Sequence, residues 1–140
     1  HFREMLRVRK SSRLLRLTTG ADVMKRVDFV PLDPAVAPGV VVMTVTDGTD
    51  ASCGMTPLAD LDPARDALVV VLNADRAAHT VTVPGAAGFT LHPVLAASAD
   101  PVVRAASATG AAFTVPARTT AVFEQVQGAA QGAGLPCNTR

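Results

Sequence analysis

The chain has 140 residues, of which 49% are hydrophobic and 18% charged, and its net charge is +1. This length suits one domain with a core of its own. No apolar run approaches the roughly 20 residues that a membrane-spanning helix needs, so we expect no membrane partner. The sequence contains no Trp and no Tyr. Such rings usually form the stacking surfaces of sugar-binding modules and of single-stranded nucleic-acid readers, so both functions are disfavoured.

The first 26 residues are basic and have a helical pattern. Eight of the thirteen basic residues and two of the twelve acidic residues lie there, which leaves +6 in this segment and −5 in the rest. Phe2, Met5 and Leu6 recur at helical spacing, with basic residues on another side. A second, short helix can be capped within 18–22 and run to Lys25. We interpret 1–26 as a helical segment whose basic side faces solvent or an interface, with no nucleic-acid partner.

From Val27 the sequence changes to short β-branched runs separated by Pro, Gly and Asp. The predicted strands are 27–32, 39–47, 67–75, 79–84 and 89–94. The run 39–47 is apolar on both faces, which indicates an interior strand, and 67–75 with 79–84 predict a hairpin. The connection 47–66 is too long for a hairpin and is a candidate crossover. Residues 97–104 are expected to form a loop or short strand.

Residues 110–125 predict a closing hairpin. Phe113, Val115, Ala121 and Phe123 are apolar at alternate positions, and Pro116 marks the turn. Short strands without helical patterns between them predict an all-β fold, an antiparallel two-sheet β-sandwich preceded by the helical segment. The predicted parts are the helical segment 1–26, the β-sandwich 27–126 and a Gly- and Ala-rich tail 127–140. We expect this tail to be disordered.

Residues that could carry chemistry are scattered. His1, His79 and His92 lie at a terminus and on two predicted strands, and the chain has no nucleophile motif such as GxSxG and no phosphate-binding glycine loop. Five carboxylates fall within one long connection: Asp47, Asp50, Asp60, Asp62 and Asp66. Calcium binding is an alternative for them, and turn formation is the preferred interpretation. We therefore assign no catalytic, cofactor-binding or metal-binding residue and expect no cofactor.

Arg118 and the two cysteines each have a structural interpretation. Arg118 lies in the predicted turn and could hold a carboxylate through two hydrogen bonds; we interpret it as a turn anchor that forms an ion pair within the loop. Cys53 and Cys137 lack the spacing of a zinc site. A long-range disulfide and two free thiols both remain open, and we favour free thiols.

Four segments carry a resemblance to a known family. They are GVVVMTVTD at 39–47, LDPARDALVVVLNAD at 61–75, ADPVVRAASA at 99–108 and VPARTTAVFE at 115–124. In this order they resemble the C-terminal domain of bacterial pullulanase-type α-1,6-glucosidases, debranching enzymes of the α-amylase superfamily. The opening residues resemble the closing helix of that family's catalytic barrel and its run into the first strand. The resemblance spans about residues 2–125.

The resemblance implies a larger enzyme whose (β/α)8 barrel carries the catalytic carboxylates and hydrolyses α-1,6-glucosidic bonds in pullulan, starch or glycogen. This chain has none of those motifs. The implied role is a non-catalytic accessory domain that stabilises or shields the barrel. The resemblance is also consistent with a secreted bacterial protein. The chain begins at His1, without Met or a signal-peptide pattern, so we expect a fragment or a processed product.

In such an enzyme Phe2, Met5 and Leu6 would pack against the barrel. Without the barrel, we expect this apolar face to fold back on the sandwich or to drive self-association. Two functions from other classes remain as alternatives: an independent carbohydrate-binding module and an immunoglobulin-like interaction module.

Overall fold

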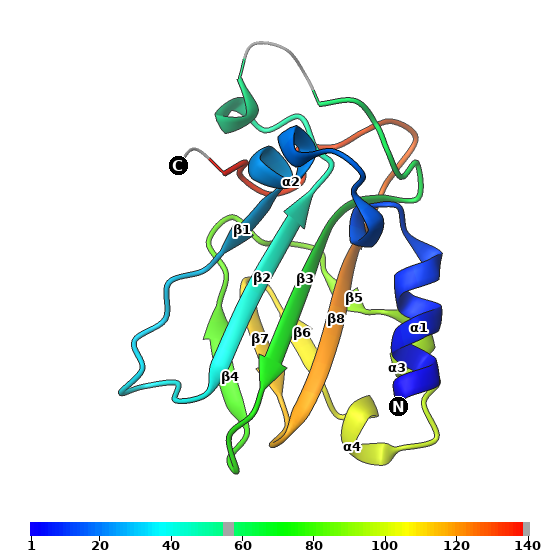
Figure 1. The fold of residues 1–140 in the computed structure, drawn as a ribbon. Coiled ribbons are helices and arrows are strands. Elements are labelled where there is room, and N and C mark those ends of the chain that lie inside the picture. The colour runs from blue at the N-terminus through cyan, green and yellow to red at the C-terminus, as the bar shows by residue number, and fades with distance from the viewer. Residues whose placement is uncertain (55–57, 139–140) are drawn as a thin grey trace.

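The computed structural model describes residues 1–54 and 58–138. Two antiparallel sheets pack face to face, and helices cover part of the outer face of the larger sheet (Figure 1). The helices are α1 (Phe2–Ser11), η1 (Leu14–Arg16), α2 (Gly20–Arg26), η2 (Ala51–Cys53), α3 (Pro93–Ala96) and α4 (Pro101–Arg104). The strands are β1 (Val27–Phe29), β2 (Val40–Thr46), β3 (Arg65–Asn73), β4 (His79–Thr82), β5 (Thr90–Leu91), β6 (Ser107–Thr109), β7 (Ala112–Val115) and β8 (Thr119–Val126). This confirms the predicted sandwich.

The larger sheet has the order β1-β2-β3-β8-β5, and the smaller one has the order β4-β7-β6. Strand β3 is central: Val70 lies opposite Met43 of β2 on one side and Val122 of β8 on the other. Residues of β3 alternate between the two faces, as side chains of a strand must. Val69 and Val71 point into the core between the sheets, whereas Leu68 and Val70 point toward the helices.

The core between the sheets is closed by three phenylalanines. Phe113 of β7 lies edge-on to Phe123 of β8, with ring centroids 5.0 Å apart, and Phe89 meets Phe113 at 5.6 Å. All three rings are buried. These edge-to-face contacts join the two sheets directly, in the geometry that aromatic pairs favour.

Both predicted hairpins are wrong. Strand β4 pairs with β7 rather than with β3, and β8 pairs with β3 and β5 rather than with β7. The physical reason lies in the two faces of each strand. Val122 and Phe123 are both buried on opposite faces of β8, so β8 needs a sheet with cover on both sides. Strand β7 places Thr114 toward solvent, where its hydroxyl lies 2.8 Å from that of Thr80, so it suits the outer sheet.

Three further expectations need correction. The connection 47–66 is not a crossover, because β2 and β3 are antiparallel neighbours. Residues 101–104 form helix α4, since Asp100 caps it by accepting a hydrogen bond from the Val102 N–H at 2.8 Å and Pro101 suits its first position. The predicted strand 89–94 shortens to β5 because Pro93 begins α3.

The tail also differs from the expectation of disorder. Residues 127–138 lack helix and strand, yet Leu135 is buried in the core between the sheets. Gly132 and Ala133 accept hydrogen bonds from the N–H groups of Thr49 and Asp50, at 2.9 and 3.0 Å. The Gly- and Ala-rich composition does not reveal this arrangement, because one buried leucine and a set of backbone hydrogen bonds hold the segment. Within the described residues, no helix is long and apolar enough to cross a membrane.

Candidate functional site

The helical segment packs on the outer face of the larger sheet. Val8 of α1 and Leu14 of η1 are buried there against Val45, Leu68 and neighbouring side chains, and Met5 is partly buried. Phe2 and Leu6 remain 77% and 45% exposed. The helix therefore packs on the sandwich through Val8, whereas of the three residues that we expected to fold back only Met5 is partly buried in that cluster.

A buried polar cluster fixes the end of α1 to the sandwich. The Ser12 hydroxyl donates to Asp62 at 2.5 Å, and Arg65 of β3 donates to the same carboxylate at 3.3 Å. The Arg65 Nε also donates to Glu124 of β8 at 2.6 Å. Asp62 and Glu124 are buried, and Arg65 is nearly so. The single cation thus pairs with two carboxylates that would be costly to bury without a partner.

His92 belongs to this cluster. The Val94 N–H donates to its Nδ1 at 3.2 Å, so the ring proton lies on Nε2, which is 2.9 Å from the Ser11 hydroxyl. Ser11 in turn donates to the carbonyl of Val8. Burial lowers the pKa of His92, and Arg65 adds to this effect, although Glu124 at 3.6 Å opposes it. His92 is therefore a neutral link between α3 and the end of α1.

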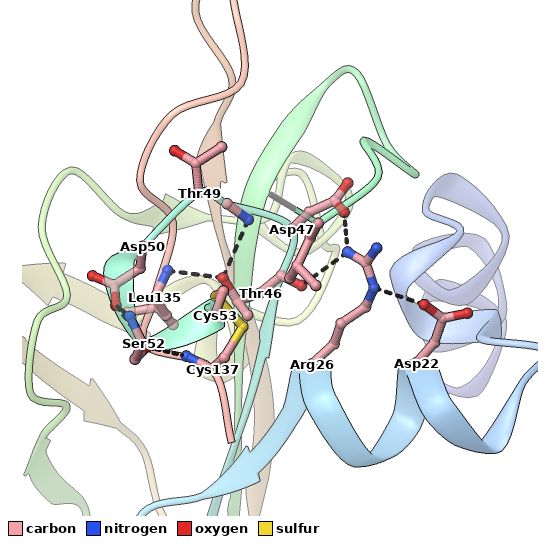
Figure 2. The surroundings of a disulfide bond; sticks show 12 residues. Asp22, Arg26, Thr46, Asp47, Thr49, Asp50, Ser52, Cys53, Leu135 and Cys137 are labelled. Carbon is pink, nitrogen blue, oxygen red and sulfur yellow. Dashed lines mark hydrogen bonds and ion pairs between the residues drawn. A yellow bond between two sulfur atoms is a disulfide. The ribbon is translucent and has the colours of Figure 1, made fainter. Parts of the chain in front are cut away.

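A second polar cluster fixes α2, and it surrounds Arg26 (Figure 2). The guanidinium is almost fully buried and donates to Asp47, to the carbonyl of Ala59 at 2.8 Å, and to Asp22 at 3.1 Å. Burial raises the pKa of Asp47, while the N–H of Asp62, the charge of Arg26 and the N–H of Leu61 oppose that shift. These contacts join α2, the end of β2 and the 59–62 loop.

The other carboxylates of the long connection serve separate structural roles. Asp50 caps η2 through the N–H of Ser52, Asp60 accepts from Gln127, and Asp66 accepts from the N–H of Gly132. In 1–54 and 58–138, no three or more His, Cys, Asp or Glu side chains are grouped so that they could hold a metal ion. Of these three, Asp50 has the turn role that we preferred, whereas Asp60 binds a side chain and Asp66 binds the backbone of the tail.

The remaining candidates lie apart from one another. His1 pairs with Glu4 at 3.4 Å, and His79 pairs with Asp75 at 2.7 Å. Arg118 is exposed in a left-handed conformation with φ of 51°, and its N–H donates to the carbonyl of Asp75. Its guanidinium forms no ion pair with any residue that the structure describes. The predicted anchor is thus the backbone of Arg118 rather than its side chain.

Cys53 and Cys137 form a disulfide, which corrects the preference for free thiols. The bond joins η2 to the tail (Figure 2). Sequence spacing could not reveal this pair, because 84 positions separate the two cysteines and the tail offers no strand to align them.

An apolar strip continues beside α1 on the same outer face. A groove of about 280 Å³ lies between α1 and the sheet, lined by Met5, Leu6, Val8, Arg9, Leu15, Met43, Val70 and Val122. Next along the strands, Val41 and Leu72 lie opposite each other and are 48% and 42% exposed. We call the groove and this pair the apolar strip.

The fold and these contacts define a class of protein: a β-sandwich domain with N-terminal helices fixed to one sheet by buried charges, and an uncovered apolar strip beside them. Comparison with known proteins makes the class specific. The model of a family described as alpha-1,6-glucosidases, pullulanase-type, C-terminal, matches residues 1–126. The chain belongs to this family, which confirms the resemblance inferred from the sequence.

Individual relatives agree. The chain is 36% identical over 127 residues to pullulanase 1, chloroplastic, of Arabidopsis thaliana, covering 88% of this chain and 13% of that protein. It is 39% identical over 145 residues to pullulanase of Klebsiella pneumoniae, covering 99% of this chain and 12% of that protein. The solved structure of PulA from Klebsiella oxytoca matches with a TM-score of 0.81 at 37% identity, over 99% of this chain and 13% of that one. The chain thus corresponds to a small part of these relatives.

Proposed function

We propose that this chain is the non-catalytic C-terminal domain of a larger pullulanase-type glycoside hydrolase, and that it packs against the catalytic barrel of that enzyme and stabilises it. The enzyme would hydrolyse α-1,6-glucosidic bonds in pullulan, starch or glycogen. The apolar strip is the observation that carries the proposal. The strip lies beside α1, and α1 belongs to the part of the chain that resembles the closing helix of the barrel.

The strip has the properties of a surface that is covered in the whole enzyme. Val41, Leu72 and Leu6 leave apolar area in water, and covering such area contributes roughly 25 cal/mol per Å². Helix α1 is itself held rigidly, because Ser12 and His92 belong to the buried cluster at its end. A rigid helix beside an open apolar surface offers a fixed platform for a neighbouring domain.

The polar side chains of the domain support a role without catalysis. Asp47, Asp62 and Glu124 are buried, and each accepts hydrogen bonds from protein donors. A glycosidase needs two carboxylates that face the scissile bond, and these three face their own fold. We therefore place the hydrolytic chemistry in other parts of the larger enzyme.

A carbohydrate-binding module is the weaker candidate. Phe89, Phe113 and Phe123 are buried in the core, whereas Phe2 and Phe29 are exposed on separate elements. Sugar rings are usually held on exposed aromatic faces. Retention of the purified chain on starch or pullulan would favour this candidate and count against the accessory role.

The test places a charge on the apolar strip of the larger enzyme. Val41→Glu introduces a carboxylate that the proposed interface would bury, so we expect the Tm of the whole enzyme to fall by at least about 3 °C. Val36→Glu is the matched control, because Val36 is 72% exposed in the loop before β2 and lies off the strip. Thermal unfolding followed by calorimetry measures both.

The isolated 140-residue chain completes the test. Here Val41 is already in water, so Val41→Glu and Val36→Glu should both leave the stability nearly unchanged. An equal effect of the two substitutions in the larger enzyme would contradict the proposal. A change of oligomeric state in the isolated chain caused by Val41→Glu alone would indicate instead that a second copy covers the strip.

A further inference from the structure

The tail is held as a strap across one end of the sandwich. Leu135 inserts into the core, and its N–H donates to the Thr46 hydroxyl at 3.0 Å. The Cys137 N–H donates to the Ser52 hydroxyl at 2.8 Å. Asn138 donates from its N–H and its side chain to the carbonyls of Lys25 and Val27, at 2.9 and 3.0 Å. The strap thus connects η2, the core, and the junction of α2 with β1.

Without the Cys53–Cys137 disulfide, the strap would be held only weakly against the sandwich. It is rich in Gly and Ala, so its release restores much backbone entropy, and Leu135 is its one large apolar side chain in the core between the sheets. The sandwich itself does not depend on the strap in this way. Among the described residues, strands β2, β3 and β8 contribute seven buried side chains to that core, and the strap contributes Leu135 alone. Closure of the strap and folding of the sandwich are therefore separable.

The disulfide that closes the strap lies beside open space. A pocket of about 370 Å³ is lined by Ala21, Met24, Lys25, Ser52, Cys53, Gly54 and Asn138. Both sulfur-bearing residues are buried, with exposures of 1% for Cys53 and 5% for Cys137, but Cys53 forms part of the pocket wall.

We propose that the Cys53–Cys137 bond is a thiol-exchange site, at which a dithiol reductant opens the strap while the sandwich remains folded. A thiolate of the reductant attacks the Cys53 sulfur, the disulfide breaks, and Cys137 leaves and takes up a proton. The second thiol of the reductant then attacks the mixed disulfide and releases Cys53 as a thiol. Two electrons and two protons pass to the protein, and the reductant leaves as a disulfide.

Opening the strap would act on α2. The Asn138 bonds to Lys25 and Val27 are lost when the tail leaves. Lys25 lies in the last turn of α2, and Val27 begins β1. In an oxidising compartment the strap stays closed, and in a reducing one it opens. The oxidation state thus controls how firmly α2 is held against the sandwich.

Amide hydrogen exchange on the 140-residue chain tests this with dithiothreitol as the reductant. On reduction, the amides of Leu135, Cys137 and Asn138 should exchange faster by a factor on the order of 100 or more. The amides of Val69 and Val71 in β3 are the internal control and should change little. In the double variant Cys53→Ser, Cys137→Ser, the tail amides should exchange as fast as in the reduced chain, and the reductant should not change their exchange rates.

Three results would overturn the proposal. The disulfide could resist the dithiol under native conditions, the tail amides could stay protected after reduction, or the β3 amides could lose protection together with the tail. The last result would mean that the disulfide holds the whole domain. If the double variant fails to fold, the comparison of oxidised with reduced chain still decides among these outcomes.

Discussion

Arg26 is a cation with almost no exposed surface, at the point where α2 ends and β1 begins. Its guanidinium fork donates to Asp47 and to the carbonyl of Ala59, so its charge and its hydrogen-bonding groups are both matched. Planar, bidentate donors suit such buried positions better than a lysine would. Removing one member of this ion pair lowers the stability of the fold, because the other charge then remains buried without its partner.

Asp47→Ala should therefore be strongly destabilising. It leaves Arg26 buried without its main counter-charge and removes the acceptor for the Leu61 and Asp62 N–H groups. We expect a loss of about 3–5 kcal/mol in the free energy of unfolding, measured by urea denaturation. Asp22→Ala is the control: its carboxylate contacts the same guanidinium but is partly exposed, so the loss should be much smaller. Equal losses would contradict this account.

His92 makes the stability of the domain depend on pH. Its pKa is lowered in the folded state, so the unfolded chain binds the proton more readily. The contribution of neutral His92 to the stability of the fold is complete above the ordinary histidine pKa of about 6.5. It is lost as the pH falls through the lowered pKa of the folded state. The groups that face the ring are Glu124 and Arg65.

The prediction is a fall in unfolding free energy between pH 7 and 5, at no more than about 1.4 kcal/mol per pH unit for one proton. His92→Asn should flatten this slope, since Asn cannot titrate and still offers an oxygen to the N-terminus of α3. Urea denaturation at several pH values measures both proteins. The same slope in the variant would assign the pH dependence to another group.

At the scale of elements, local patterns predicted α1, α2 and the described strands other than β6, but they missed α3, α4 and the pairing of the strands. Thr19 accepts from the Asp22 N–H at the start of α2, and such a cap is visible in sequence. The pairing of β4 with β7 depends on which strands have two buried faces, and alternation within one strand does not show this. The turn at Arg118 carries the chain from one sheet to the other, although its length suits a hairpin.

The polar clusters could not be predicted either. Ser12, Asp62, Arg65, His92 and Glu124 come from separate segments, and each is ordinary in its own stretch of sequence. Only the fold brings them together. One local signal was present: Glu124 follows Val122 and Phe123 in the last strand, and a carboxylate beside two buried positions indicates a partner.

The strap requires glycine at position 134, where a side chain would meet both strained backbone geometry and neighbouring atoms. Gly134 has φ of 68°, and a Cβ there would lie 2.7 Å from the Thr46 hydroxyl and 2.8 Å from the backbone of Gly48. Gly134→Ala should therefore dislodge the strap and cost about 1–3 kcal/mol in unfolding free energy. Gly128→Ala is the control, since nothing lies within 4 Å of its added Cβ. Faster proteolysis of the tail in the first variant alone would agree with this prediction.

At the scale of the whole molecule, the helical segment and the sandwich form one body. The outer face of the larger sheet is buried at one end by Val8 and Leu14 and left open at the other, where Val41 and Leu72 lie. A sheet with two apolar faces needs three layers to be fully covered. The proposed barrel would complete the third layer, and this explains why a domain with a good core still exposes apolar strand residues.

The position of β8 has a consequence for biosynthesis. Among the described strands β8 comes last in the chain, yet it lies between β3 and β5 inside the larger sheet. Until residues 119–126 leave the ribosome, β3 has an open edge where β8 will pair. At about 5–20 residues per second, this state lasts several seconds for each nascent chain. The domain closes only when synthesis has passed its final strand, so during that interval a chaperone has its clearest target.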